Sequence, residues 1–362
     1  MRWRAVFAST APSKNRASNT PWPTILTTAS GAAPQSASVG GSLATAGSPF
    51  ARAKKLSDID PTPTLGQVAP VLECVINVSE GRNAPAIEAI SSAAGACLLD
   101  VHTDPWHNRT VLTIAGPGVE QAARSVAQSA VSLLDITEHA GANPRLGVID
   151  VVPFVPITLT PTMARDPSGR PTAGSVDLSR ALAARDAFAT YAAFKLGVPC
   201  FLYGPERSLP EVRRRAFVTD PPDTGPPVAH PTAGAICVGA REVLIAYNVW
   251  LAVDDLYLAD EIARAMRSTQ VRALALEVGG RAQVSCNLVE PWSFGPTEAF
   301  DFVAGRAPVA KAELVGLLPA SVLESIPADR WPELDLGEDR TIEGRLSERD
   351  LSANEDPALK LK

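Results

Sequence analysis

The sequence predicts a mixed α/β protein, an α+β sandwich whose two halves share one order of elements. Short apolar runs typical of strands alternate with stretches in which apolar residues recur every three or four positions. The order strand, helix, strand, strand, helix, strand occurs in residues 67–218 and again in residues 219–326. This is the split βαβ order of ferredoxin-like units, so we expect two ferredoxin-like βαββαβ subdomains.

The first half shows the clearest helix at residues 119–135. Its apolar side chains follow the three-and-four spacing of a helix with one buried face, and they are Val119, Ala122, Ala123, Val126, Ala130, Leu133 and Leu134. A second helix is expected at 85–94. The strands of this half are expected at 71–78, 97–101, 110–115 and 148–155.

A helix near 179–196 and a strand near 198–203 connect the two halves. In the second half Gly279-Gly280 indicates a hairpin turn. The expected elements there are one long or two short strands in 235–251, a helix at 255–266, strands at 271–278 and 282–289, a helix at 296–303 and a closing strand at 313–318. Two sheet-bearing subdomains that meet along their faces would form a cleft, a common place for a ligand.

The two ends of the chain differ from this pattern. Residues 1–66 are rich in Ala, Ser, Thr, Pro and Gly and contain no acidic residue before Asp58. Such a composition predicts a disordered low-complexity tail, although a transit-like targeting extension has the same character. Residues 327–362 are polar and charged, and we expect a loose C-terminal tail there.

Composition restricts the class of function. The net charge of −6 argues against nucleic acid as a partner, and no apolar run reaches the roughly 18 residues of a membrane span. The five cysteines lie singly in apolar runs, which is typical of buried thiols in a reducing compartment. The four histidines show no ligand spacing with them, so no metal site is expected. A cytoplasmic enzyme fits all of this.

The loop at residues 139–145 enters an apolar strand and carries groups suited to chemistry. The imidazole of His139 can move protons near neutral pH, and Arg145 offers a planar fork for a carboxylate. Pro144 keeps Asn143 extended and stiffens the loop. The alternative is a surface turn in which His139 caps the preceding helix, and the sequence leaves both interpretations open.

Two further segments carry candidate binding groups. Arg109 can hold an anion and Asn108 can orient one just before a strand, with Asn77 at the end of the first strand. A polar hairpin loop and a helix cap are the structural alternatives. The second segment is stiff and rich in proline, so it forms either a wall for an aromatic ring or a linker: Gly225, Pro226, Pro227, Val228, Ala229, His230, Pro231, Thr232, Ala233 and Gly234.

Several short stretches, in this order, resemble the formiminotransferase domain family, the glutamate formimidoyltransferase-like proteins, over residues 72–320. They include Glu73-Cys74-Val75 with Asn77, Ser79-Glu80-Gly81, Asn108-Arg109-Thr110-Val111, Pro144-Arg145 with Gly147, and Leu244-Ile245-Ala246-Tyr247-Asn248. The resemblance implies two α/β subdomains around a cleft, a homodimer, and transfer of a formimino group between N-formimidoyl-glutamate and tetrahydrofolate. The resemblance also implies that tetrahydrofolate is a substrate and that no metal is needed.

The resemblance also implies roles for the candidate residues. Arg109 and Arg145 would bind the glutamate carboxylates, and Asn77 and Asn108 would orient polar groups. The stretch 225–234 would contact folate. The family places its acid/base histidine where this chain has Asn143, and an amide cannot exchange a proton near neutral pH. His139 is then the expected substitute.

Asn143 also favours an alternative, a catalytically silent folate-binding or regulatory module. A transferase or ligase for another amine or acyl donor is a third possibility.

Overall fold

The computed structural model describes residues 71–141, 145–157, 164–165, 171–172 and 177–355. All of them belong to one compact unit, Pro63–Lys362. The expected N-terminal tail and Asn143 lie outside the described residues.

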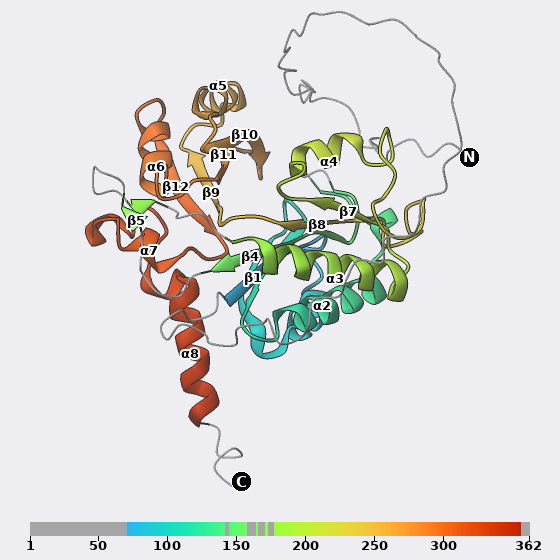
Figure 1. Ribbon diagram of the computed structural model, residues 1–362. Helices are drawn as coiled ribbons and strands as arrows, with labels where there is room; N and C mark the ends of the chain where they lie inside the picture. Colours follow the sequence, from blue (N-terminus) through green and yellow to red (C-terminus); the bar gives the residue numbers. More distant parts are fainter. Residues whose placement is uncertain (1–70, 142–144, 158–163, 166–170, 173–176, 356–362) are drawn as a thin grey trace, which may run out of the picture. The chain divides into compact units, whose positions relative to one another are not determined.

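A six-stranded sheet forms the first half of the protein (Figure 1). Its strand order is β2-β3-β1-β4-β8-β7, and the first four strands pair antiparallel. Those four strands and two helices give the βαββαβ order of a ferredoxin-like unit, as the sequence predicts. They are β1 (Val71–Val78), α1 (Ala84–Ser92), β2 (Leu98–Asp104), β3 (Arg109–Ala115), α2 (Val119–Leu133) and β4 (Ile149–Ile157), with short 3₁₀ turns at Gly95–Cys97 and Ile136–Glu138.

The remaining two strands of this sheet are β7 (Cys200–Tyr203) and β8 (Ile236–Ala240). They pair parallel, and β8 also pairs parallel with β4. The helix α3 (Ser179–Lys195) precedes them and α4 (Leu209–Arg215) lies between them. A subdomain boundary at 218/219, as expected from the sequence, would divide this sheet. The strand β8 follows residue 219 in the chain but pairs with β4 and β7 of the first half. We propose that the subdomains meet in residues 241–244, between β8 and the next strand.

A four-stranded antiparallel sheet forms the second half, with the order β10-β11-β9-β12. It repeats the ferredoxin-like order of the first half, so the fold class is confirmed. Its elements are β9 (Ile245–Leu251), α5 (Leu256–Met266), β10 (Val271–Val278), β11 (Arg281–Leu288), α6 (Pro296–Ala304) and β12 (Val309–Val315). A separate small ribbon joins β5 (Ala164–Arg165) to β6 (Pro171–Thr172).

Local sequence explains where several of these elements begin and turn. Asn83 caps α1 by accepting the backbone N–H of Ala86, and Asp255 caps α5 by accepting that of Leu258. Gly279 and Gly280 both have positive φ in the turn between β10 and β11. Two such residues match the twist of a tight hairpin, as expected from the pair of glycines.

Each sheet packs its helices over an apolar core. Leu72, Cys74 and Ile76 of β1 are fully buried with residues of α1, α2 and α3, and Figure 1 shows α2 and α3 side by side. The second core joins α5 and α6 to the inner face of the second sheet. Four of the five cysteines are buried and Cys97 is half-buried, and all five are free thiols. This agrees with their interpretation as small apolar residues.

The C-terminal residues differ from the expected loose tail as far as the structure describes them. After α7 (Ala320–Leu323), the expected tail contains 3₁₀ turns at Ala328–Arg330 and Glu338–Arg340, and α8 (Ile342–Glu355). Leu334 and Leu336 lie in the second core, and Tyr247 donates its hydroxyl to the carbonyl of Leu334 at 2.8 Å. A few well-spaced apolar residues therefore anchor an otherwise polar stretch.

The two halves touch through specific side chains. Leu99, Ala115 and Ile157 of the first half form a small apolar cluster with Leu317 and Ile342. Ile342 is the first residue of α8. The cluster therefore holds the start of this helix against β2, β3 and β4 of the first sheet.

A polar contact also spans the halves. His102 of β2 lies 3.9 Å from the carboxylate of Glu313 on β12. The same carboxylate accepts hydrogen bonds from Asn248 at 3.0 Å and from the indole of Trp250 at 3.2 Å, both on β9.

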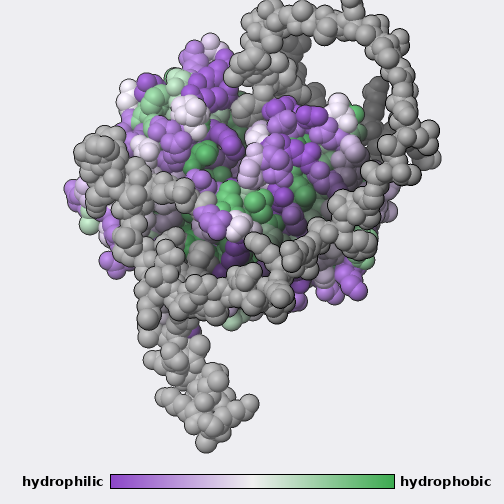
Figure 2. Space-filling view, viewed as in Figure 1, coloured by the Kyte–Doolittle hydropathy of each residue, from purple (hydrophilic) through white to green (hydrophobic). Residues whose placement is uncertain are grey.

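The surface is mixed. Figure 2 shows a face on which hydrophilic residues predominate and hydrophobic ones occupy small areas. Scattered exposed apolar side chains such as Phe194 and Tyr257 are ordinary for a folded domain. Among the helices within the described ranges, none is long and apolar enough to cross a membrane.

Candidate functional site

A small hollow lies where the end of β1, the turn between β2 and β3, and the loop before β4 meet. Four of the residues that the sequence singles out line it together, namely Asn77, Asn108, Arg109 and Arg145. Val78, Ser79, His107 and Asp150 complete its wall. The hollow lies within the first subdomain, so binding in a cleft between the subdomains stays a prediction.

Arg109 is the partly buried cation of this hollow. Its Nε donates to Oδ1 of Asn77 at 2.9 Å, and Nη2 donates to the same oxygen. Burial lowers the pKa of the guanidinium to about 10. A desolvated cation beside a neutral amide attracts an anion strongly, because little water screens the charge.

Asn108 ties three loop segments together. Its Oδ1 accepts the backbone N–H of Gly81 at 2.8 Å, and its Nδ2 donates to the carbonyl of Ala140 at 3.1 Å. Its φ of +48° is in the left-handed region, which an asparagine tolerates better than most residues. Gly81 is needed beside it, because a Cβ there would lie 2.5 Å from the backbone nitrogen of Arg109. The side chain of Asn108 thus shapes the hollow.

His139 and Arg145 form a pair next to the hollow. Nε2 of His139 donates to the carbonyl of Asn108 at 2.8 Å, and Nδ1 accepts from Nη1 of Arg145. Nη2 of Arg145 donates to the carbonyl of Gly141 at 2.7 Å. Burial is the largest cause of a lowered pKa at His139, and the charge of Arg145 lowers it further. Both ring nitrogens of His139 are occupied by protein groups.

Asp150 and Arg213 add a partly buried ion pair that the sequence-based list omits. Asp150 is 4% exposed, forms an ion pair with Arg213 of α4, and accepts the backbone N–H of Leu146 at 2.9 Å. Desolvation opposes the charge of Arg213, but the neighbouring groups led by Asp150 raise its pKa overall. The sequence does contain a signal for this pair. Asp150 is a carboxylate within the apolar run at 148–155, and a charge buried there needs an oppositely charged partner.

His107 is a further residue that the sequence-based list omits. It is 7% exposed and lines the hollow between Asp104 and Arg109 in the β2–β3 turn. The sequence shows it directly before Asn108, but nothing in a polar turn distinguishes a buried histidine from an exposed one.

The last residues of the stretch 225–234 run beside the loop that carries Arg145. The backbone N–H of Ala235 donates to Leu146 at 2.9 Å, and that of Val148 donates to Ala233 at 3.0 Å. His230 and Gly234 exchange backbone hydrogen bonds at 2.8 and 3.0 Å. The described residues that line the hollow do not include any from this stretch.

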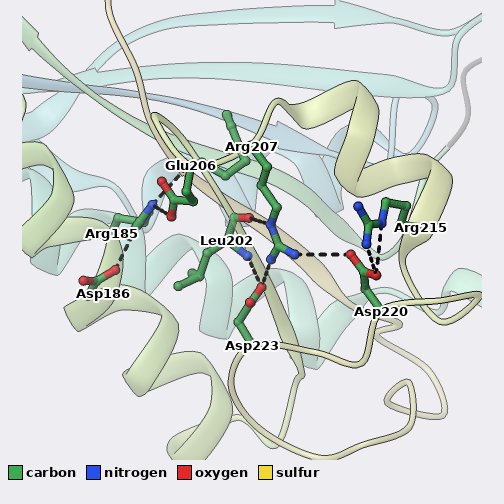
Figure 3. A network of polar contacts seen from close by, with 9 residues as sticks. Arg185, Asp186, Leu202, Glu206, Arg207, Arg215, Asp220 and Asp223 are labelled. Carbon is green, nitrogen blue, oxygen red and sulfur yellow. Dashed lines mark hydrogen bonds and ion pairs between the residues drawn. The ribbon is translucent and has the colours of Figure 1, made fainter. Parts of the chain in front are cut away.

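A network of charged side chains braces the start of the same stretch (Figure 3). Asp223 accepts the backbone N–H of Leu202 at 2.7 Å and forms an ion pair with Arg207. Arg207 in turn donates to the carbonyl of Leu202 at 2.7 Å and faces Asp220, which also pairs with Arg215. These contacts attach the proline-rich stretch to β7.

Within the described ranges, no group of three or more His, Cys, Asp or Glu side chains is arranged to hold a metal ion.

Comparison with known proteins agrees with the resemblance seen in the sequence. The profile of the formiminotransferase domain, N-terminal subdomain, matches residues 71–241. A glutamate formimidoyltransferase of Streptococcus pyogenes serotype M1 is 35% identical over 289 residues, which cover 71% of this chain and 91% of that protein. The glutamate formimidoyltransferase of Thermoplasma acidophilum is 33% identical and is covered to 89% of its length.

A longer relative matches over part of its length. The formimidoyltransferase-cyclodeaminase of Sus scrofa is 32% identical over 71% of this chain and 51% of its own length. The fold defines the class as α/β proteins built of two ferredoxin-like subdomains. Within that class, the chain belongs to the formiminotransferase family.

Proposed function

We propose that this protein transfers a formimino group between N-formimidoyl-glutamate and tetrahydrofolate. The observation that carries the proposal is the hollow in which Arg109 and Arg145 lie together beside Asn77 and Asn108. The family and the names of its members support the same reaction. Tetrahydrofolate enters as a substrate.

The two arginines suit the acidic part of the donor. A guanidinium binds a carboxylate through two parallel charge-assisted hydrogen bonds, and a glutamate derivative carries two carboxylates. Burial strengthens the interaction at Arg109, whose own hydrogen bonds go to the neutral amide of Asn77. Arg109 and Arg145 therefore bind and orient the donor, and the stretch 225–234 contacts the folate.

The chemistry is an exchange of one amine for another at the formimino carbon. N5 of tetrahydrofolate attacks that carbon and a new C–N bond gives a tetrahedral centre. The proton on N5 must leave and one proton must reach the glutamate nitrogen, after which the old C–N bond breaks. Glutamate and 5-formimidoyl-tetrahydrofolate are released. The protein must supply a group that accepts and returns this proton. His107 lines the hollow, and His139 contacts Arg145, which lines it as well.

Turnover of N-formimidoyl-glutamate with tetrahydrofolate tests the proposal directly. We expect measurable turnover by the wild type and a rise of about ten-fold or more in Asn143→His, because a positioned acid/base contributes about 10²–10⁴-fold. Calorimetric titration with tetrahydrofolate accompanies the assay. No activity in either protein would refute the transferase.

A silent folate-binding module is the second candidate, and Asn143 is the observation that favours it. It predicts binding of tetrahydrofolate without turnover by the wild type. The absence of binding would remove both candidates. The expected homodimer and the cytoplasmic location stay predictions.

A further inference from the structure

Asp150 places a carboxylate in the wall of a hollow whose arginines suit an anion. It lies near the start of β4, is 4% exposed, and lines the hollow together with Arg109 and Arg145. A donor with two carboxylates would meet this like charge in the same hollow, and a buried charge is screened only weakly. The binding roles proposed for the two arginines leave the presence of this carboxylate unexplained.

The backbone of the loop that carries Arg145 explains why an oxygen is needed there. Oδ1 of Asp150 accepts the backbone N–H of Leu146 at 2.9 Å. The hydroxyl of Ser79 donates to the carbonyl of Gly147 at 2.8 Å and holds the next residue of the loop. Asp150 therefore helps to fix the position of Arg145. An amide oxygen could accept the same backbone N–H, so this role does not depend on a negative charge.

Arg213 of α4 compensates the charge of Asp150. Its Nη2 donates to Oδ2 of Asp150, and the two side chains form an ion pair. The side chain of Arg213 is 22% exposed and that of Asp150 is 6% exposed. The described residues that line the hollow do not include Arg213. Its influence on the hollow is therefore electrostatic.

The charges of this pair reach both arginines of the hollow. Burial is the largest cause that lowers the pKa of Arg109 and of Arg145. Among the charged neighbours, Asp150 has the largest effect and raises both pKa values, and Arg213 follows and lowers them. The carboxylate and the guanidinium thus act in opposite directions at the two cations that would bind the donor.

We propose that Arg213 determines the affinity of the hollow for an acidic donor by neutralising the carboxylate of Asp150 from outside the hollow, and this inference rests on the proposed function. Asp150 serves as the acceptor that holds the loop of Arg145. Its negative charge would repel the donor carboxylates if Arg213 did not compensate it. Arg213 is therefore a specificity-determining residue that acts without touching the donor.

Calorimetric titration of the full-length protein with N-formimidoyl-glutamate tests the inference without requiring turnover. Arg213→Gln leaves the carboxylate of Asp150 uncompensated, so we expect Kd to rise by about ten-fold or more. Asp150→Asn in the same background removes that charge and keeps an oxygen for the backbone N–H of Leu146. The double variant should therefore return to within about three-fold of the wild-type Kd.

Arg214→Gln is the matched control, because it removes the same charge from an exposed side chain of the same helix. Its Kd should stay within about two-fold of the wild type, since solvent screens an exposed charge. The calorimetric stoichiometry separates charge from structural damage. Unfolded protein lowers the number of binding sites and leaves the Kd of the folded molecules unchanged.

Asp150→Asn alone is an independent test. It gives the hollow one more positive charge, so this variant should bind the donor at least as tightly as the wild type. Weaker binding would show that the charge of Asp150 assists the donor, and would overturn the inference even if Arg213→Gln did not fold.

The remaining outcomes are distinct. An Arg213→Gln variant that binds the donor like the wild type refutes the role of Arg213 and leaves the proposed function intact. A double variant as weak as Arg213→Gln refutes it as well, because the loss would then not come from the charge of Asp150. A wild type that does not bind the donor refutes the donor site of the proposed function, and the role of Arg213 with it.

Discussion

Glu73 shows how burial sets the properties of a single side chain. It lies on β1, is 4% exposed, and faces the side of the first sheet opposite α1, α2 and α3. Burial is the largest effect and raises the pKa of its carboxyl from 4.5 to about 7, against the lowering effect of Arg241. An acid with a raised pKa in the folded state opposes folding once it ionises.

The expected consequence is a stability that falls as the pH rises from about 4.5 to about 7, between the two pKa values of Glu73. Below this range the carboxyl is neutral in both states and costs nothing. Above it the penalty is complete and is on the order of 3 kcal/mol. Glu73→Gln should therefore raise the free energy of unfolding by this order at pH 8 and change it little at pH 4.5, as measured by urea denaturation.

Glu88→Gln on the exposed face of α1 is the matched control and should have little effect at either pH. An equal stability gain at both pH values for Glu73→Gln would show that ionisation of Glu73 is not the cause.

At the scale of single elements, the stretch 219–234 depends on charge contacts because it has few apolar side chains to bury. Asp223 satisfies the backbone N–H of Leu202 on β7 and pairs with Arg207. The other end of the stretch pairs with residues 146–148 by backbone hydrogen bonds. The loop is therefore anchored at both ends, which favours one conformation for ligand contact.

Asp223→Ala should loosen this loop. Removal of an acceptor that serves a backbone N–H and an arginine is expected to lower the free energy of unfolding by about 1.5–3 kcal/mol. A loop that must be ordered again on binding should also weaken tetrahydrofolate binding by about ten-fold, which corresponds to about 1.4 kcal/mol. Thermal denaturation and calorimetry measure the two effects.

Asp186→Ala is the control from the same network in Figure 3, because its side chain is 58% exposed in its ion pair with Arg185. Arg185 is buried but keeps its ion pair with Glu206 when Asp186 is removed, so loss of this solvent-facing carboxylate should cost about 0–1 kcal/mol. If both variants bind tetrahydrofolate like the wild type, the braced stretch does not contact folate.

At the scale of the whole molecule, the C-terminal residues complete the second core and join it to the first half. Leu334 is fully buried in that core, and Ile342 contacts Leu99, Ala115 and Ile157. Residues 316–355, the described chain beyond β12, are thus part of the folded unit.

Leu334→Ala should lower the free energy of unfolding by about 2–5 kcal/mol, the usual cost of removing a buried leucine side chain. Leu133→Ala at the end of α2, where the leucine is 51% exposed, should cost less than about 1 kcal/mol. Urea denaturation compares the two. A cost for Leu334→Ala no larger than that of the control would support the loose tail expected from the sequence.

Much of this protein could be predicted from local patterns. The spacing of apolar residues gives α2 and the strands of both halves to within a few positions, because it records which face of an element is buried. The glycine pair at 279–280 gives a hairpin turn. The motifs around Asn77, Asn108, Arg109 and Arg145 give the family and four residues of the hollow.

Long-range contacts decided the rest. The apolar run of β8 predicts a buried strand but does not indicate which sheet the strand joins. Only its pairing with β4 and β7 assigns it to the first half. Likewise the few apolar residues near 334–342 show no period, yet the fold buries them.

The sequence by itself determined the order of elements, the family and the candidate cations, since each depends on residues close together in the chain. The tertiary structure alone decided that Nδ1 of His107 is enclosed with no hydrogen-bond partner among the described residues, and that Nδ1 of His139 accepts from Arg145. The physical reason is that desolvation and hydrogen-bond partners depend on segments some 30 residues apart, as for His139 and Asn108.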